Sequence, residues 1–203
     1  MEAGSPDDIE LLEAWRGGDA AAGNTLFGRH FSAVNRFFRS KVEGGVEDLV
    51  QATFMACVEG RDRFEGRSSF RAYLFGIARH QLLAWYKGRR REVDPERESA
   101  ADLGVSPSEA VVQREESRLL LRALRSLPLD QQITVELFYW EGLTGNELAQ
   151  ALGVSPHTVR SRLNRARTAL REAIERLATD PAAARSTLDD LDGWALRLRV
   201  QIG

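Results

Sequence analysis

Residues 143–170, LTGNELAQALGVSPHTVRSRLNRARTAL, constrain the fold of this chain more than any other segment. Thr144 and the glutamate three residues later form the pattern of a capping box, which starts a helix. Gly153 can adopt the left-handed conformation that ends that helix, and Ser155 followed by Pro156 suits the start of another. The segment therefore predicts two helices joined by a tight turn, which is the layout of a helix-turn-helix.

The second helix of this motif has two chemically different faces. One face is an apolar stripe with steps of three or four residues, as burial requires: Val159, Leu163, Ala166, Leu170, Ile174 and Leu177. The other face can contact phosphates and base edges: His157, Arg160, Ser161, Asn164 and Arg165. The pattern predicts a helix that reads DNA. A solvated basic face on an ordinary helical hairpin is the alternative interpretation.

The rest of the chain is also patterned for helices. Apolar residues recur at helical spacing in several segments: 9–15, 26–38, 46–58, 70–90, 115–126, and from after Asp130 to Trp140. Residues 60–69, GRDRFEGRSS, read as a basic loop. No segment alternates as a half-buried strand does. The pattern predicts an all-α protein.

Charge divides the chain into parts. Residues 61–91 contain nine basic and two acidic residues, whereas residues 92–116 contain eight acidic and two basic ones. Residues 93–112 also contain two prolines and Gly104 and show no periodicity, which indicates a flexible acidic linker between two small helical domains. The linker would lower the affinity of the free chain for phosphate, so we expect DNA binding only when something else holds the chain open.

Several functional classes are disfavoured by composition. Cys57 is the only cysteine, so an internal disulfide is impossible, and the acidic N-terminus does not resemble a signal peptide. No apolar run reaches the length of a membrane span, and we expect a cytoplasmic protein without membrane insertion. His30, His80 and His157 are scattered, and no glycine-rich phosphate loop follows a strand. We therefore expect no metal, no cofactor and no enzymatic activity.

Two blocks of the chain resemble the extracytoplasmic-function sigma factors, small initiation factors of bacterial RNA polymerase. The first block is GDAAAGNTLFGRHFSAVNRFF, EDLVQATF and SSFRAYLFGIARHQLLAWYKGRRR at 18–38, 47–54 and 68–91. The second is LRSLPLDQQITVELFYWEGLTGNELAQALGVSPHTVRSRLNRARTALRE at 124–172. The resemblance covers roughly residues 8–178. It implies a sigma region 2 domain at 8–92, a linker at 93–112, a sigma region 4 domain at 113–178 and a C-terminal extension at 179–203.

The resemblance also assigns roles to individual residues. The family's DLVQ helix docks on the clamp helices of the polymerase, which implies polymerase contact by Asp48, Leu49, Gln51 and Phe54. The next segment holds the melted non-template strand of the −10 element, which implies contacts by Arg61, Arg63, Arg67, Ser69, Arg71, Tyr73, Arg79, His80 and Lys87. The second domain reads the −35 element as duplex, through His157, Thr158, Arg160, Ser161, Asn164 and Arg165.

Core RNA polymerase and promoter DNA are the partners that the resemblance implies, with an anti-sigma factor as a candidate regulator. His80 stands where the family usually has asparagine, which leaves the −10 preference open. Leu49, Phe54 and Tyr73 could alternatively belong to the hydrophobic core. Trp85 lies on the apolar stripe of its helix, and we expect it to be a core residue.

The tail beyond the second block carries apolar residues at helical spacing: Leu188, Leu191, Trp194 and Leu198. It is interpreted either as an amphipathic helix that packs on the second domain or as an extension that docks a regulatory partner.

Two other functions stay open at this level. One is a helix-turn-helix regulator that binds an operator independently of polymerase, usually as a dimer, although the arginine-rich first half does not resemble a receiver or sensory domain. The other is an adaptor whose basic faces hold an acidic protein. Sequence-specific DNA protection in the presence of polymerase would separate these from a sigma factor.

Overall fold

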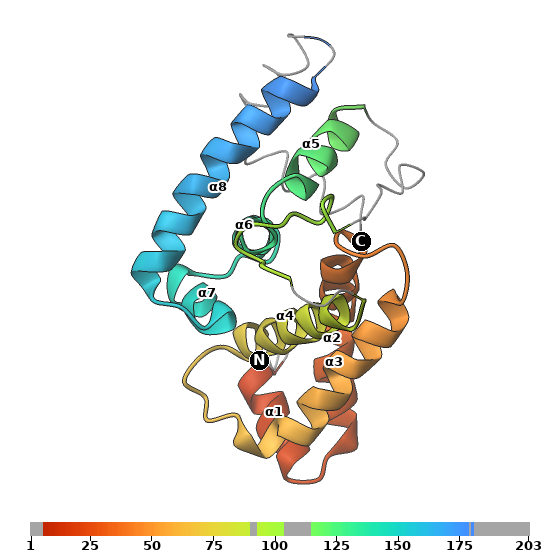
Figure 1. The fold of residues 1–203 in the computed structure, drawn as a ribbon. Helices are drawn as coiled ribbons and strands as arrows, with labels where there is room; N and C mark the ends of the chain where they lie inside the picture. Colours follow the sequence, from red (N-terminus) through yellow and green to blue (C-terminus); the bar gives the residue numbers. More distant parts are fainter. Residues whose placement is uncertain (1–5, 90–92, 104–114, 179, 181–203) are drawn as a thin grey trace.

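The computed structural model describes residues 6–89, 93–103, 115–178 and 180, and every regular element in this part of the chain is helical (Figure 1). The elements are α1 (Asp8–Arg16), α2 (Ala20–Arg39), α3 (Val46–Gly60), the short 3₁₀ helix η1 (Arg61–Arg63), α4 (Phe70–Arg89), α5 (Glu115–Arg125), α6 (Leu129–Tyr139), α7 (Gly145–Leu152) and α8 (Pro156–Leu177). The all-α prediction is confirmed. The end of the linker and, apart from position 180, the C-terminal extension lie outside the described residues.

Polar caps set the helix starts in the first half of the chain. The carboxylate of Asp7 accepts from the backbone N–H of Ile9 and Glu10 at 2.8 Å, and the carboxylate of Glu10 in turn accepts from the N–H of Asp7. Asp19 caps α2 in a similar way, so α2 begins at Ala20, six residues before the start of the predicted 26–38 segment. The difference arises because residues 20–25 lack large apolar side chains, and the cap rather than periodicity decides where the helix begins.

The core of the first domain is formed by aromatic and aliphatic residues from α1 to α4. Leu12, Leu26, Phe38, Phe70 and Phe75 are all essentially inaccessible to water. The predicted basic loop at 60–69 contains η1, and its Phe64 is buried against the ring of Tyr73. The loop is thereby fixed between α3 and α4.

The helix-turn-helix forms at the predicted boundaries. The Thr144 hydroxyl and the Glu147 carboxylate make the reciprocal capping box, and Gly153 has φ 66° and ψ 33°, the left-handed conformation that ends α7. Ser155 caps α8, and Pro156 occupies its first turn. Five residues therefore define this turn through local interactions alone.

The two halves of the chain pack against each other. Figure 1 shows α4 between the first-domain helices and the α6–α7 layer, and the buried apolar cluster of the first domain continues into Leu129, Ile133, Leu148 and Leu152. Gly76 permits the close approach of α4 and α7, because a Cβ atom there would lie 3.4 Å from the carbonyl oxygen of Ala151. The described chain is a closed arrangement of both halves.

The described part of the linker is held against the α5–α6 turn. The N–H groups of Leu129 and Asp130 donate to the carbonyl oxygens of Glu98 and Pro95, each at 2.8 Å. Ala100, a few residues further along, is completely buried. Residues 93–103 are therefore not a free tether, because their backbone groups find partners in the second domain.

Candidate nucleic-acid interface

The first turns of α8 present the residues predicted to read duplex DNA. His157, Arg160, Asn164 and Arg165 are exposed, and Thr158 and Ser161 are half-buried beside them. An open groove of about 640 Å³ lies between α7 and the start of α8, lined among others by His157, Arg160 and Asn164. The structure thus brings the predicted −35 residues onto one surface.

The cap of α8 uses part of this surface. The backbone N–H of Thr158 donates to Ser155 Oγ at 3.1 Å, and the two hydroxyl oxygens are 2.8 Å apart. Ser155 and Thr158 therefore fix the direction of the first turn, and Arg160 projects from a rigid base.

Arg162, on the same helix, does not belong to the DNA-reading surface, whereas Arg167 lines the same groove. Arg162 is 3% exposed and its guanidinium lies 3.0 Å from Glu96 of the linker and 3.4 Å from Asp130 of α6. Arg167 Nε donates to the Tyr139 hydroxyl at 2.7 Å. Arg162 therefore joins the linker to α6, and Arg167 contacts α6 from the edge of the groove.

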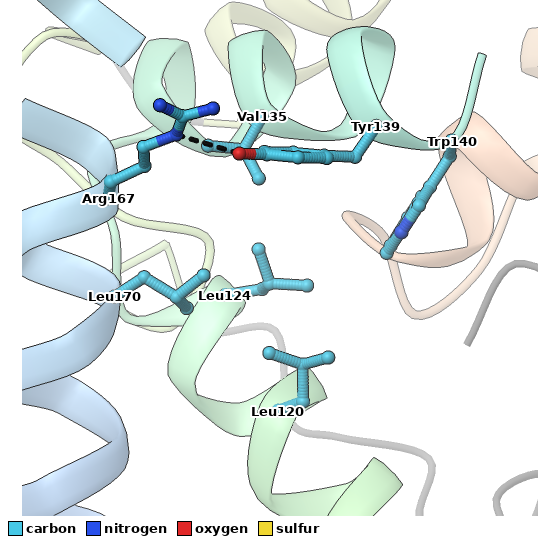
Figure 2. Close-up of a pocket in the computed structure, with 7 residues that line it drawn as sticks. All are labelled: Leu120, Leu124, Val135, Tyr139, Trp140, Arg167 and Leu170. Atoms are coloured by element: carbon cyan, nitrogen blue, oxygen red, sulfur yellow. Dashed lines mark hydrogen bonds between the residues drawn. The ribbon is translucent and has the colours of Figure 1, made fainter. Parts of the chain in front are cut away.

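A small apolar pocket lies beneath Arg167, between α5, α6 and α8. Figure 2 shows the guanidinium and the Tyr139 ring on one side of it, with apolar side chains opposite. The other lining residues are Leu120, Leu124, Val135, Trp140 and Leu170. Because the buried residues of this group belong to the core cluster of α5, α6 and α8, we interpret the pocket as a packing feature of that core.

The residues predicted to bind the −10 strand fall into two groups, one exposed and one half-buried. Arg63, Arg67, His80 and Lys87 are exposed, whereas Arg61, Ser69, Arg71, Tyr73 and Arg79 are half-buried. A cavity of about 380 Å³ gathers part of this set, with Tyr73 and His80 in its wall beside Ser68. Lys87 does not line this cavity and lies about two turns further along α4.

Tyr73 also makes a structural contact with Gly60, at the end of α3. Its hydroxyl donates to the carbonyl oxygen of Gly60 at 3.2 Å, and a Cβ atom at Gly60 would lie 2.3 Å from that hydroxyl. Burial raises the pKa of Tyr73 above its ordinary value. Trp85 packs on the core as expected, and the Arg89 guanidinium lies 3.8 Å from the centre of its ring.

The exposed face of α3 is more apolar than the four predicted polymerase contacts suggested. Asp48 and Gln51 are exposed and Phe54 is half-buried, but Leu49 is 5% exposed and lies in the core. Met55 and Val58 continue the same face, 54% and 43% exposed. Their spacing from Gln51, four and seven residues, is a signal that the sequence reasoning missed.

Phe31 of α2 joins this face. It is 51% exposed, and its ring lies nearly parallel to that of Phe54, with the centroids 6.3 Å apart. We call Phe31, Gln51, Phe54, Met55 and Val58 the α3 patch. Exposed apolar side chains that cluster in this way mark a protein contact surface.

Acid should weaken the capping of α7. Burial acts to raise the pKa of Glu147, but hydrogen bonds from Ser69 and Thr144 and the charge of Arg71 lower it below its ordinary 4.5. A carboxyl with a lowered pKa stabilises the fold above its unfolded pKa, and the gain is lost as pH falls through the folded value. We expect the stability difference between wild type and Glu147→Gln to be constant from neutral pH to about 5 and to shrink below 4.5 in urea titrations. A difference that persists undiminished in acid would contradict this.

Comparison with known proteins defines the class to which this fold and surface belong. Residues 26–92 match the family description "Sigma-70 region 2", and residues 117–170 match "Sigma-70, region 4". The chain is 32% identical over 187 residues to the ECF RNA polymerase sigma-E factor of Escherichia coli K12, covering 84% of this chain and 95% of that protein. It is 30% identical over 148 residues to the ECF sigma factor SigX of Bacillus subtilis 168, covering 70% and 76%.

Solved structures agree with this match. The structure of CnrH in complex with the cytosolic domain of CnrY has a TM-score of 0.61 and 27% identity, covering 84% of this chain and 97% of that one. The sigma factor RpoE in complex with the anti-sigma factor NepR from Bartonella quintana has a TM-score of 0.60 and 25% identity, covering 75% and 96%.

The chain belongs to the extracytoplasmic-function sigma factors. It is an RNA polymerase sigma factor, a transcription initiation protein and not an enzyme. No helix in the described ranges is long and apolar enough to cross a membrane. The same ranges contain no cluster of three or more His, Cys, Asp or Glu side chains suited to a metal ion.

Proposed function

We propose that this sigma factor divides promoter recognition between its two halves. The region 4 domain, residues 113–178, reads the −35 element as duplex through His157, Thr158, Arg160, Ser161, Asn164 and Arg165. The observation that carries this proposal is the exposure of the arginines and Asn164 on one face of a capped helix, beside an open groove. Arginine and asparagine can make two-pronged hydrogen bonds to guanine and adenine edges in the major groove.

The region 2 domain, residues 8–92, holds the non-template strand of the melted −10 element. Single-strand binding requires cations along the backbone and aromatic or polar walls for unstacked bases. Arg63, Arg67 and Lys87 supply exposed charge, and the cavity beside Tyr73 and His80 supplies the walls. His80 is the residue through which this chain would differ from relatives in its −10 preference.

Core polymerase binds the α3 patch together with Asp48. We expect Met55→Asp to lower affinity for core polymerase by about tenfold or more, because a charge replaces an exposed apolar side chain in a contact that must exclude water. Fluorescence anisotropy with labelled sigma factor would measure this. Glu59→Asp, on the same helix but outside the patch, is the control and should change affinity little; equal effects of the two substitutions would refute the assignment.

The decisive experiment adds the purified chain to core polymerase and a genomic promoter library and sequences the transcripts. We expect transcripts that share two upstream elements at constant spacing, because linked modules act as a bivalent binder. An operator-binding regulator would instead protect its DNA target without polymerase. Protection of the same sites by the chain alone, with equal affinity, would favour that alternative.

An anti-sigma factor is the regulator that we propose. RpoE, whose structure is similar to 75% of this chain, was solved with the anti-sigma factor NepR. We further propose that the chain works in the cytoplasm, where bacterial polymerase and promoters are located. Co-purification of the tagged chain from its own cells, with and without an inducing stress, would test both points.

A further inference from the structure

The last residue of α1, Arg16, contacts the basic loop of the region 2 domain. Its Nε and Nη2 donate to the carbonyl oxygen of Arg61 at 3.1 and 2.5 Å, and Nη2 also donates to the carbonyl oxygen of Phe64. These hydrogen bonds join positions 45 and 48 residues apart. Helix α1 precedes residues 26–92, which match region 2, and none of the roles that the family resemblance implies falls on it. The contacts of Arg16 are therefore a feature that the family motifs do not explain.

Arg16 supplies hydrogen-bond donors where two helices end. Helices α3 and η1 end at Gly60 and Arg63, and the carbonyl oxygens of a last helical turn have no partner inside the helix. The Tyr73 hydroxyl donates to the carbonyl oxygen of Gly60, and the Arg16 guanidinium donates to the two acceptors described above. An arginine fork can bind several acceptors in one fixed geometry. The backbone at the start of the loop is thereby fixed by both α1 and α4.

Trp15, the preceding residue of α1, contacts a side chain of the same loop. The Arg61 guanidinium lies 5.2 Å from the centre of the Trp15 ring, within the range of a cation–π interaction. The ring itself is fixed, because it packs edge-on against Phe27 and lies so close to Gly23 that a Cβ atom there would be 2.7 Å away. An aromatic ring anchored in the core therefore orients one of the arginines proposed for the −10 strand.

The fixed part of the loop leads directly to the proposed strand-binding residues. Arg63 and Arg67 are exposed, and Ser68 lies in the wall of the cavity beside Tyr73 and His80. A ligand binds more tightly to groups that are already ordered, because less conformational entropy is lost on binding. Selectivity among bases further requires that the cavity wall keep one geometry. The anchoring of the loop by α1 is therefore suited to both the affinity and the selectivity of strand capture.

We propose that Arg16 is a positioning residue for the −10 element: it fixes the loop at 60–69 in the conformation that admits a base to the cavity beside Tyr73. The inference rests on the proposed function of this loop and adds a residue of α1 to it. Arg16 acts through the backbone of Arg61 and Phe64 and does not contact the strand itself. Loss of its guanidinium should therefore change which bases are accepted, and not merely how tightly phosphates are bound.

Trypsin measures whether Arg16 fixes the loop, without polymerase or DNA. In the full chain, Arg16→Ala should speed cleavage after Arg63 and Arg67 by about fivefold or more, because a loop released from its anchor fits a protease more readily. The control is Glu13→Ala, which removes the other partner of Arg16 and leaves its bonds to the loop. Cleavage after Arg171 of α8, exposed in the other half of the chain, corrects each digest for global unfolding. Equal loop cleavage in both variants, after this correction, would overturn the proposal.

The second experiment measures base selectivity in the assembled holoenzyme. Core polymerase with wild type, Arg16→Ala or Glu13→Ala transcribes the best library promoter and versions of it with single substitutions in the −10 element. The ratio of transcription between the best and the substituted promoters should fall by about fivefold or more in Arg16→Ala and stay unchanged in Glu13→Ala. The affinity of Arg16→Ala for core polymerase should remain close to that of wild type, because the α3 patch is intact.

Two other results would contradict a positioning role. An equal loss on every promoter, with an unchanged ratio, would mean that Arg16 binds phosphate or only supports the fold. A fall in polymerase affinity that accounts for the whole loss would mean that Arg16 acts on polymerase docking.

Failure of this inference and failure of the proposed function give different results. If wild type selects −10 bases and Arg16→Ala selects them equally well, only the positioning role is refuted. If wild type itself transcribes all substituted promoters equally, the loop does not read the −10 element, and the proposed function of the region 2 domain is refuted whatever the trypsin digests show.

Discussion

Replacement of both Arg160 and Arg165 by alanine is expected to lower transcription from a cognate promoter by about 30-fold or more, because each contact to a base edge is worth roughly 1–3 kcal/mol. Both side chains are exposed on the first half of α8, so their loss should leave the fold intact. Multi-round transcription with core polymerase and a promoter from the library would measure the loss.

The matched control for this double variant lies on the same helix. Arg171→Ala with Arg176→Ala removes the same charge from the exposed far half of α8. Its effect should be several times smaller, because general attraction to phosphate remains while base contacts are untouched. Comparable losses in the two variants would mean that α8 acts through charge alone and does not read sequence.

Truncation of Glu136 is expected to cause the largest loss of stability. Lys41 and Glu136 are 0% and 1% exposed, and Ser40 and Gln132 also donate to the Glu136 carboxylate. Burial lowers the pKa of Lys41, and Glu136 is the main group that opposes this shift. Glu136→Ala leaves a buried ammonium without its counterion, which should cost about 3–5 kcal/mol in urea unfolding.

Two companion variants separate the buried pair from a generic loss of charge. Glu13→Ala breaks the pair between the exposed Glu13 and the half-buried Arg16, leaves Arg16 bonded to backbone carbonyl oxygens, and should cost only about 0.2–1 kcal/mol. Lys41→Met combined with Glu136→Leu removes both charges and should recover most of the stability lost in Glu136→Ala. If Glu136→Ala costs no more than Glu13→Ala, the pair is not buried in solution and the two halves do not pack as described.

Local patterns predicted most helices of this chain accurately. The capping box at Thr144, the turn at Gly153 and the cap at Ser155 are each completed within a few residues, so the sequence contains both partners side by side. Helix α2 is the exception in its boundary, since its start depends on the Asp19 cap and its first residues lack large apolar side chains. Interactions of short sequence range are the ones that such reasoning can find.

The direction in which a charged helix residue points was less predictable. Arg71 and Arg79 look like DNA-facing cations in the sequence, yet each contacts a carboxylate from a distant segment. Leu49 and Phe54 share one helix and one family motif, but only Phe54 reaches the surface. Periodicity identifies a buried stripe without saying which element covers it.

The sequence by itself determined the helical composition, the helix-turn-helix and the membership of the sigma factor family, because these depend on caps, spacing and motifs that lie within short segments. Only the tertiary structure decided that the halves close on each other. Arg36 meets Glu141 across 105 positions of sequence, and Arg125 Nε reaches the carbonyl oxygen of Ser40 across 85. Nothing local specifies such pairs, since a buried charge selects its partner only after the helices that carry both have packed.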